Sequence, residues 1–359
     1  MKLLPWSEFA RIEPLFAGSG NAEGLPGWYA TLIETTLAAG EMPVCAVAES
    51  GQTVTAAIPL VVTARGLRAL TAPYTTRFVP FLPDVSSAHK IGSGLRAVAS
   101  GRVWLDGLDA ADACHQALAA GLGRTMVTAT YQGFANWTAP VDDFAAYWQS
   151  RPARLRSTVK RKAAAAKARF HYLNGNFEAA LRDYEAIRAA SWKAAEPHPA
   201  FLAALVQNLA PVVRMGLLEI GDRPVAAQIW LVHGGRATIF KLVHRDDTAA
   251  LSPGTLLTNR MIEACLQREA VRVLDFGRGD DAYKRDWMTA RSTRLGVIAA
   301  DWRRAQGLRS IATEILPTVA GCAWRRQFGH KSDGSATADD AEMLAPSNRQ
   351  GTVSSEALP

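Results

Sequence analysis

The order of strand-like and helical segments between residues 170 and 302 limits the possible folds of this chain more than any other feature. Apolar residues there recur with a period of about two in some segments and about 3.6 in others, which are the periods of strands and helices. Turn-forming residues separate the segments. The pattern predicts a strand, two helices, three strands, a helix, a strand, a short helix and a strand. We therefore expect a mixed α/β fold of the α+β type.

Two kinds of local signal support this order. Gly221-Asp222 and Gly234-Gly235 are typical of two-residue hairpin turns, so the three strands should be joined tightly. Ser252-Pro253-Gly254 is typical of a helix start, where Ser can cap free amide groups and Pro suits the first turn. The predicted elements lie at 170–173, 177–194, 198–210, 212–244 (the three strands), from 252 (a helix), 271–277, 281–288, 293–302 and 307–328.

The chain divides into four predicted parts. Residues 1–140 contain strand-like runs between 43 and 134 and one helical pattern, which predicts a further mixed α/β unit. Residues 141–170 are a predicted basic helical connector, with eight basic residues and no acidic one between Asp143 and Arg169. Residues 171–330 contain most of the ordered pattern described above. Residues 331–359 are rich in polar residues without periodicity, which predicts a disordered tail.

The composition, with 48% hydrophobic and 20% charged residues, is that of a folded and water-soluble protein. The formal net charge of +7 favours anionic partners without selecting among phosphorylated cofactors, nucleic acid and membrane surfaces. The sequence contains neither a signal peptide nor an apolar run of about 20 residues, so we expect a cytoplasmic protein without a membrane span. The cysteines are widely spaced and predict no metal site and no redox pair: Cys45, Cys114, Cys265 and Cys322.

The segment DFGRGDDAYKRDW, residues 275–287, closely resembles the signature of the BioF-like, CelD-like acetyltransferase domain. That domain is a branch of the GNAT superfamily and is related to the FemABX aminoacyl transferases. Three further segments fit the resemblance, namely 154–170, 221–244 and 251–257. The resemblance is strong over about residues 150–305. Because YTTRFVPFLPD at 74–84 also fits, it implies two tandem GNAT-like halves around mixed sheets, with 1–140 as a degenerate half and 171–330 as the acyltransferase domain.

The resemblance implies a donor site for an acyl thioester. In such a fold the strands 237–244 and 271–277 splay apart, and their unpaired backbone groups can bind an extended pantetheine-like carrier. The helix start supplies free amides for a pyrophosphate. However, residues 245–254 carry two aspartates and lack the Gln/Arg-x-x-Gly-x-Gly/Ala pattern of coenzyme A enzymes, so an ordinary helix start is the alternative. The predicted donor-binding residues are His244, Arg245, Ser252, Gly254 and Thr255.

The catalytic candidates are Lys284, Tyr283 and Asp275. Acyl transfer develops negative charge on the carbonyl oxygen and on the leaving group, so a fixed cation and a phenol are suitable chemistry. The resemblance implies that Lys284 stabilises this charge and that Tyr283 protonates the leaving group. The alternative is a surface helix with a solvated lysine. Asp275 is either a general base or orienting group, or a cap for the glycine-rich turn that follows it.

The candidates for substrate binding are Arg278, Lys241 and His233. Arg278 can hold an anionic group or face solvent, and the histidines at strand ends suit amine deprotonation but are more often structural. The basic residues 160–169 can hold an anionic substrate or tRNA, although a solvated helix face is the simpler interpretation.

Three functions remain open from the sequence. The first is an acyltransferase that uses acyl-CoA, acetyl-CoA for example, or an acyl carrier protein, and acts on an amine or hydroxyl of a small-molecule or saccharide acceptor such as a polysaccharide or cell-envelope precursor. The second is a FemABX-like transferase that uses aminoacyl-tRNA. The third is a non-catalytic GNAT-fold binding protein.

Overall fold

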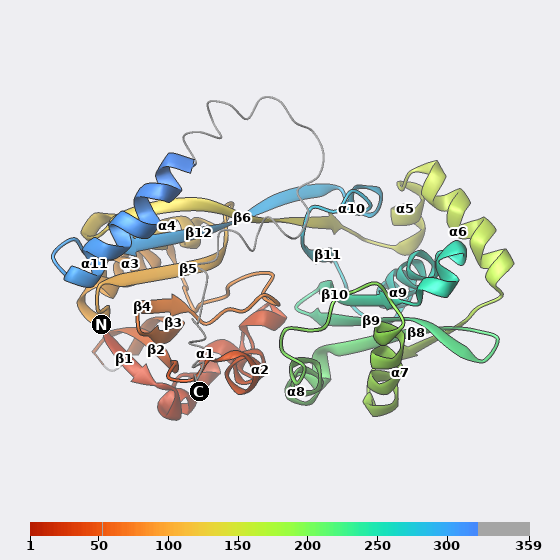
Figure 1. The fold of residues 1–359 in the computed structure, drawn as a ribbon, viewed down its shortest axis with the longest axis horizontal. Helices are drawn as coiled ribbons and strands as arrows, with labels where there is room; N and C mark the ends of the chain where they lie inside the picture. The colour runs from red at the N-terminus through yellow and green to blue at the C-terminus, as the bar shows by residue number, and fades with distance from the viewer. Residues whose placement is uncertain (52, 322–359) are drawn as a thin grey trace, which may run out of the picture.

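The computed structural model describes residues 1–51 and 53–321. The predicted tail at 331–359, and the last residues of the helix predicted at 307–328, lie outside the described residues. Within them, twelve strands form one continuous mixed sheet in the order β1-β2-β3-β4-β5-β12-β6-β11-β10-β9-β8-β7. The two ends of this sheet form two halves that lie side by side (Figure 1). The α/β class predicted from the sequence is confirmed.

The first half is built mainly from the chain before residue 141. Its strands are β1 (Lys2–Pro5), β2 (Met42–Ser50), β3 (Thr53–Thr63), β4 (Gly66–Ala69), β5 (Arg102–Asp109) and β6 (Val127–Pro140). Its helices are η1 (Trp6–Arg11), α1 (Glu13–Ala17), η2 (Ala22–Gly24), α2 (Pro26–Thr36), α3 (Val85–Val98) and α4 (Ala113–Thr125).

The second half follows the predicted order of elements. Its strands are β7 (Arg169–Leu173), β8 (Val213–Ile220), β9 (Arg223–His233), β10 (Arg236–His244), β11 (Val273–Arg278) and β12 (Ala290–Ala300). Its helices are α5 (Phe144–Gln149), α6 (Ala153–Ala166), α7 (Glu178–Ala189), α8 (Phe201–Asn208), η3 (Ala210–Val212), η4 (Asp246–Leu251), α9 (Pro253–Arg268) and α10 (Lys284–Trp287). The last described helices, α11 (Ala305–Ser310) and the π-helical η5 (Ile311–Ile315), lie beside β12, β5 and β6. Both predicted hairpin turns are confirmed, because Gly221, Asp222, Gly234 and Gly235 all have positive φ.

Two long strands are exchanged between the halves. β12 comes from the end of the described chain, yet it lies between β5 and β6 of the first half and is antiparallel to both. β6 belongs to the first half, yet its far end pairs with β11 of the second half from Pro140 to Asn136. Figure 1 shows these two strands side by side across the molecule. The sheet therefore continues through residue 140, where the sequence suggested a boundary between two parts.

Strand alternation divides the core between the two faces of the sheet. In β9, Ile229 and Leu231 pack with α7 and α8 on one face of the sheet. Trp230 and Val232 pack with α9 on the other face. In the first half, α3 and α4 cover the face that Ala46 and Ile58 occupy.

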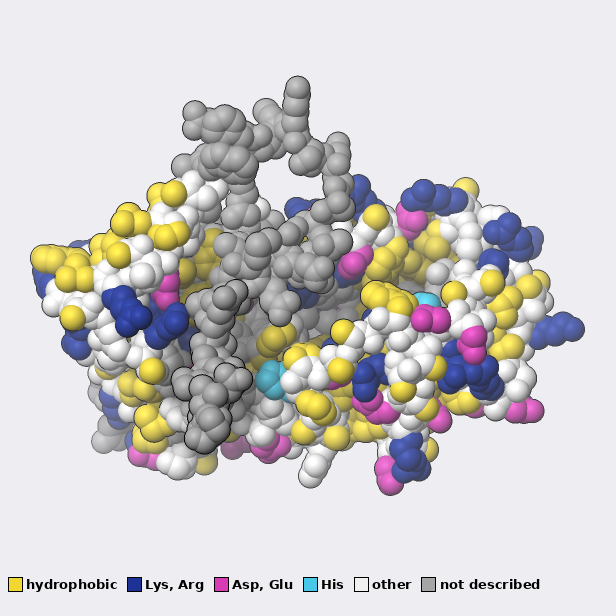
Figure 2. Space-filling model, in the orientation of Figure 1, with side chains coloured by type: hydrophobic (Ala, Val, Ile, Leu, Met, Phe, Trp, Pro, Cys, Tyr) yellow, Lys and Arg dark blue, Asp and Glu magenta, His cyan; other side chains and the backbone are white. Residues whose placement is uncertain are grey.

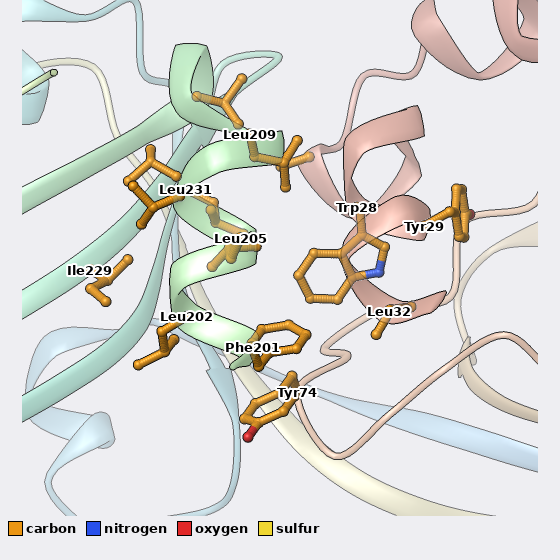
Figure 3. Packing of buried hydrophobic residues seen from close by; sticks show 14 of the residues in the cluster. Trp28, Tyr29, Leu32, Tyr74, Phe201, Leu202, Leu205, Leu209, Ile229 and Leu231 are labelled. Carbon is orange, nitrogen blue, oxygen red and sulfur yellow. The ribbon is translucent and has the colours of Figure 1, made fainter. Parts of the chain in front are cut away.

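One core cluster belongs to both halves. Trp28 of α2 lies edge-on to Phe201 of α8, with the ring centroids 5.9 Å apart, and Tyr74 stacks on Phe201 at 3.9 Å (Figure 3). All three side chains are buried. Gly27 allows this close approach, since a Cβ there would lie 2.2 Å from the carbonyl oxygen of Asn208. The two halves thus share an apolar interior.

Candidate active site

The expected divergence of β10 and β11 is present. The two strands are parallel and pair at only three positions, of which Thr238 opposite Asp275 is the last. β10 continues to His244 and β11 continues to Arg278, and a β-bulge in β10 between Ile239 and Lys241 marks the point of divergence. The predicted splay of these strands is confirmed, and it leaves backbone groups of both strands without a neighbouring strand over this stretch.

Asp275 lies buried where the two strands diverge, at the floor of the cleft between them, with both carboxylate oxygens occupied. Oδ1 accepts hydrogen bonds from the Gly277 backbone N–H at 2.8 Å and from Asn136 Nδ2 at 2.7 Å. Oδ2 pairs with Arg236 Nη1 at 2.9 Å. The structure therefore contains the turn-capping arrangement that the sequence left open, and it adds two partners that the sequence analysis did not identify, Asn136 and Arg236.

Lys284 is buried rather than solvated, with 3% of the residue exposed. Its Nζ donates to the backbone oxygens of Arg278 at 2.6 Å and Gly279 at 3.3 Å, and lies 3.2 Å from Asp281 Oδ2. Burial lowers the pKa of the ammonium group, while the Asp281 carboxylate opposes that shift. Gly279 has a φ of +111°, and a Cβ there would lie 3.2 Å from the lysine Nζ. Lys284 thus holds the loop after β11 in place and keeps a cation beside the cleft.

Tyr283 and Arg278 flank this loop. Tyr283 is 51% exposed, and its ring centroid lies 6.3 Å from that of Phe276. The guanidinium of Arg278 lies over the ring of Phe134 in β6, 4.2 Å from its centroid, so it packs on the first half instead of extending freely into solvent.

On the β10 side, the predicted residue Lys241 is joined by two charged residues that the sequence did not indicate, Glu196 and Lys193. Lys241 Nζ pairs with Glu196 at 2.8 Å, and Lys193 Nζ donates to the backbone oxygen of Leu242 in β10. Burial lowers the pKa of Lys193, and the charges of Lys241, Glu196, Asp281 and Lys284 also act on it. A cavity of about 280 Å³ lies here, lined by Tyr184, Arg188, Trp192, Lys193, Ala194, Ala195, Glu196, Lys241 and Val243.

The sequence pattern did not indicate Lys193, because it predicts a helix over 177–194 that is longer than the one observed. α7 ends at Ala189, and the segment Ser191–His198 is irregular. The signal available in the sequence was the pair of prolines Pro197 and Pro199, which cannot continue a helix.

The start of α9 closes the end of the cleft. A Cβ on Gly254 would lie 3.3 Å from His244 and 3.6 Å from Leu242, so the helix start is close to the end of β10. The prediction that Ser252 caps the helix is wrong, because its φ of +53° turns the chain and its side chain makes no capping bond. The first amides of α9, which include those of Gly254 and Thr255, therefore have no side-chain cap. Arg245 lies next to this turn, and its buried Nε has no hydrogen-bond partner among the described residues and lies 3.6 Å from Asp247 Oδ1.

Lys162 also reaches this turn. Its Nζ donates to the backbone oxygen of Ala250, so this residue of the basic helix α6 contacts the segment before α9 and is not simply solvated. His233 is the last residue of β9 and pairs with Arg236 at the start of β10, whereas His244 lies at the end of β10. The Nε2 of His233 contacts the Ser19 backbone oxygen at 2.8 Å. The structure thus places the other predicted residues in or next to β10, β11, α10 and the start of α9, and leaves His233 apart at the end of β9.

The matching place in the first half is filled by the chain itself. β4 and β5 are parallel and pair at only two positions, which leaves a similar gap. Phe78 N–H donates to the Gly107 oxygen at 2.9 Å across this gap, and Phe81 pairs with Ala57. Asp84 caps the following helix α3. Among the described residues, the open cleft is therefore the one in the second half.

Comparisons with known proteins agree with this geometry. Residues 149–285 match the family described as the acetyltransferase (GNAT) domain. The structure of FemX superposes with a TM-score of 0.59 at 11% identity and covers 83% of this chain and 97% of FemX. The C-terminal domain of a putative lysylphosphatidylglycerol synthetase from Agrobacterium fabrum superposes with a TM-score of 0.54 at 12% identity. The match covers 85% of this chain and 96% of that domain.

A tandem GNAT protein from the clavulanic acid biosynthesis pathway superposes with a TM-score of 0.51 at 13% identity. The match covers 83% of this chain and 98% of the tandem GNAT protein. These likenesses concern the fold. No curated protein sequence matches the chain.

Within residues 1–51 and 53–321, no helix is both long and apolar enough to cross a membrane. No group of three His, Cys, Asp or Glu side chains in the same residues is placed to hold a metal ion.

Proposed function

Because this chain belongs to the GNAT superfamily and has a FemX-related fold, we propose that it is an acyltransferase that uses acyl-CoA. It moves the acyl group from the thioester to an amine or hydroxyl of a small-molecule or saccharide acceptor, and it acts in the cytoplasm. The single observation that carries this proposal is the splayed cleft between β10 and β11, which ends at the uncapped start of α9.

The cleft offers the contacts that a pantetheine arm needs. An extended chain with alternating amide groups can bond to the backbone of β10 beyond Thr238 in the manner of an added strand. At the end of the cleft, the amides of Gly254 and Thr255 and the cation of Arg245 favour a phosphate group. Asp246 and Asp247 lower this preference, and the ion contact of 3.6 Å between Arg245 and Asp247 offsets part of their charge.

The chemistry follows from what the reaction must stabilise. The acceptor attacks the thioester carbonyl and releases its proton to the solvent, negative charge develops on the carbonyl oxygen, and the carbon–sulfur bond then breaks to release a thiolate. Lys284 places a buried cation beside this region, where a charge acts more strongly than in water. The phenol of Tyr283, whose pKa is raised by desolvation, stays protonated at neutral pH and can supply the proton to the leaving sulfur.

A second function is favoured by specific observations. Lys162 links the basic helix α6 to the segment before α9, and Figure 2 shows Lys and Arg side chains gathered over α6. Residues 245–254 lack the usual coenzyme A pattern. These features, and the likeness to FemX, support aminoacyl-tRNA as the alternative donor.

A binding screen on the full chain separates the candidates. Thermal shift and native mass spectrometry with acetyl-CoA, longer acyl-CoAs, acylated carrier protein and charged tRNA report a bound donor by a raised melting temperature or a mass increment. The proposal predicts binding of an acyl-CoA. Binding of charged tRNA alone would favour the second function, and binding of none of the four would favour a non-catalytic GNAT-fold protein.

A further inference from the structure

A second cavity, of about 400 Å³, lies between the two halves and away from the β10–β11 cleft. Its walls come from the loop at 19–21, the segment 77–82, the start of α4, the β9–β10 hairpin and the start of β11. Since β10 and β11 begin at this cavity and splay apart further along, the two sites lie toward opposite ends of the paired strands. We propose that this cavity binds a small anion bearing phosphate or carboxylate groups.

The charge of the lining supports an anionic ligand. Three arginines line the cavity, Arg77, Arg236 and Arg272, against one aspartate, Asp112. Arg77 Nη2 lies 3.2 Å from both Asp109 and Asp112, and the Asp109 carboxylate is shared with Arg294 at 2.9 Å. The carboxylates beside the cavity are therefore already paired with protein cations, and the lining as a whole carries an excess of positive charge.

Two of the arginines have unused donors. Arg236 donates from Nη1 to Asp275, and its remaining guanidinium N–H groups make no hydrogen bond to the described residues. The side chain of Arg272 is exposed and forms neither a hydrogen bond nor an ion pair with the part of the chain that the structure describes. A guanidinium presents a planar set of donors that matches two oxygens of a carboxylate or phosphate.

His115 and the β9–β10 hairpin form further parts of the wall. His115 is buried, and its Nδ1 accepts the Asp109 backbone N–H at 2.9 Å, so the ring proton is on Nε2. Burial lowers the pKa of His115 to about 4, which keeps the ring neutral near pH 7. On the other side, a Cβ on Gly234 would lie 2.1 Å from the Gly20 oxygen, so the hairpin packs directly on the first half. The cavity volume is suited to a small molecule rather than to a peptide or a nucleic acid.

The cavity is connected to the cleft through one residue. Arg236 lines the cavity and holds Asp275, which in turn caps the turn at Gly277 on the floor of the cleft. An anion bound by the free donors of Arg236 therefore lies one ion pair away from the cleft. The proposal stands on residues different from those of the proposed acyltransferase site, and either can fail without the other.

The test is isothermal titration of the full chain with three probes: inorganic phosphate, pyrophosphate and succinate. Arg272→Ala removes a cavity donor without breaking an internal contact, and Arg124→Ala is the matched control, since Arg124 is exposed on α4 and unpaired among the described residues. We expect at least one probe to bind, with Kd raised about tenfold by Arg272→Ala and little changed by Arg124→Ala. Preference for the phosphates or for succinate identifies which oxyanion the cavity takes.

Two outcomes would overturn the proposal. One is that no probe binds to the wild-type chain at 10 mM, on the order of the weakest affinity that a functional anion site shows. The other is that a probe binds equally well to the wild type and to Arg272→Ala, because pyrophosphate would then be bound elsewhere, for example at the start of α9. Acetyl-CoA titrated into the same variants shows separately whether the β10–β11 cleft is occupied.

Discussion

Lys284 is the residue on which the proposed chemistry depends most. Its ammonium is buried beside the cleft and bonded to the loop at 278–279, so Lys284→Met removes a charge that acts mainly in the transition state. We expect turnover to fall by about 100-fold to 1000-fold with little change in donor affinity. Tyr283→Phe should slow the reaction less, because a thiolate can leave without a proton. Steady-state kinetics and donor titrations measure both effects.

The control for this variant follows from the structure. Lys162 bonds to Ala250 next to α9, whereas Lys160 on the same helix is exposed and forms neither a hydrogen bond nor an ion pair with the described residues, so Lys160→Met is the matched control. Near-normal turnover of Lys284→Met would contradict the assigned role and would move Asp275 or His244 ahead as candidates.

Glu23 is a buried carboxyl group beside Thr76, and its titration provides a pH-dependent test of the structure. Its carboxylate accepts hydrogen bonds from Thr76 N–H at 2.5 Å and Thr76 Oγ1 at 2.7 Å. Desolvation by burial raises the pKa of Glu23 from 4.5 to about 7, and Thr76 opposes that shift. Between these two values the folded state holds a proton that the unfolded state releases, so the free energy of unfolding should fall as the pH rises from about 4.5 to about 7.

The variant Glu23→Gln removes this titration. We expect it to be more stable than the wild type at pH 8 by up to about 3 kcal/mol and to lose the difference near pH 4. Urea denaturation at several pH values measures the difference in the free energy of unfolding between the two proteins. His115 is present in both, so its own titration contributes equally and cancels in this difference. An equal pH dependence in both proteins would show that Glu23 is ionised without cost in the folded state.

At the scale of elements, the contact between α2 and α8 is the most sensitive joint. Gly27→Ala would place a methyl group 2.2 Å from the Asn208 oxygen, which is backbone and cannot rotate away. We expect a loss of about 1–3 kcal/mol in the free energy of unfolding, because the two helices must separate. Gly18→Ala is the control, since a Cβ at Gly18 meets nothing within 4 Å. Equal denaturation midpoints for the two variants would contradict this account of the joint.

Sequence patterns predicted the elements of the second half well because their amphipathic periods are regular and their turns are marked by glycine and proline. They missed α2 and α3, whose sequences PGWYATLIETT and VSSAHKIGSGLRAV contain residues with weak helix propensity and gain stability from tertiary packing instead. The cleft could be predicted from two strands and a helix start. The partners of Asp275 could not, because Asn136 comes from a strand 139 residues away in the chain.

At the scale of the whole molecule, the exchanged strands should make the two halves depend on each other. β5 and β6 of the first half pair with β12, and β11 of the second half pairs with β6. The fragments 1–140 and 141–321 should therefore lack cooperative unfolding when produced separately and regain it when mixed or co-expressed. Circular dichroism during urea denaturation tests this, and a cooperative transition of 141–321 alone would contradict the prediction.

Hydrogen–deuterium exchange of the full chain with and without saturating acetyl-CoA locates the donor site. We expect the backbone amides at 241–244 in β10 and at 254–255 at the start of α9 to become protected, because the donor bonds to them as an added strand. Amides of α3 in the first half should not change. Protection confined to other segments, or no protection at all, would contradict the assignment of the β10–β11 cleft as the donor site.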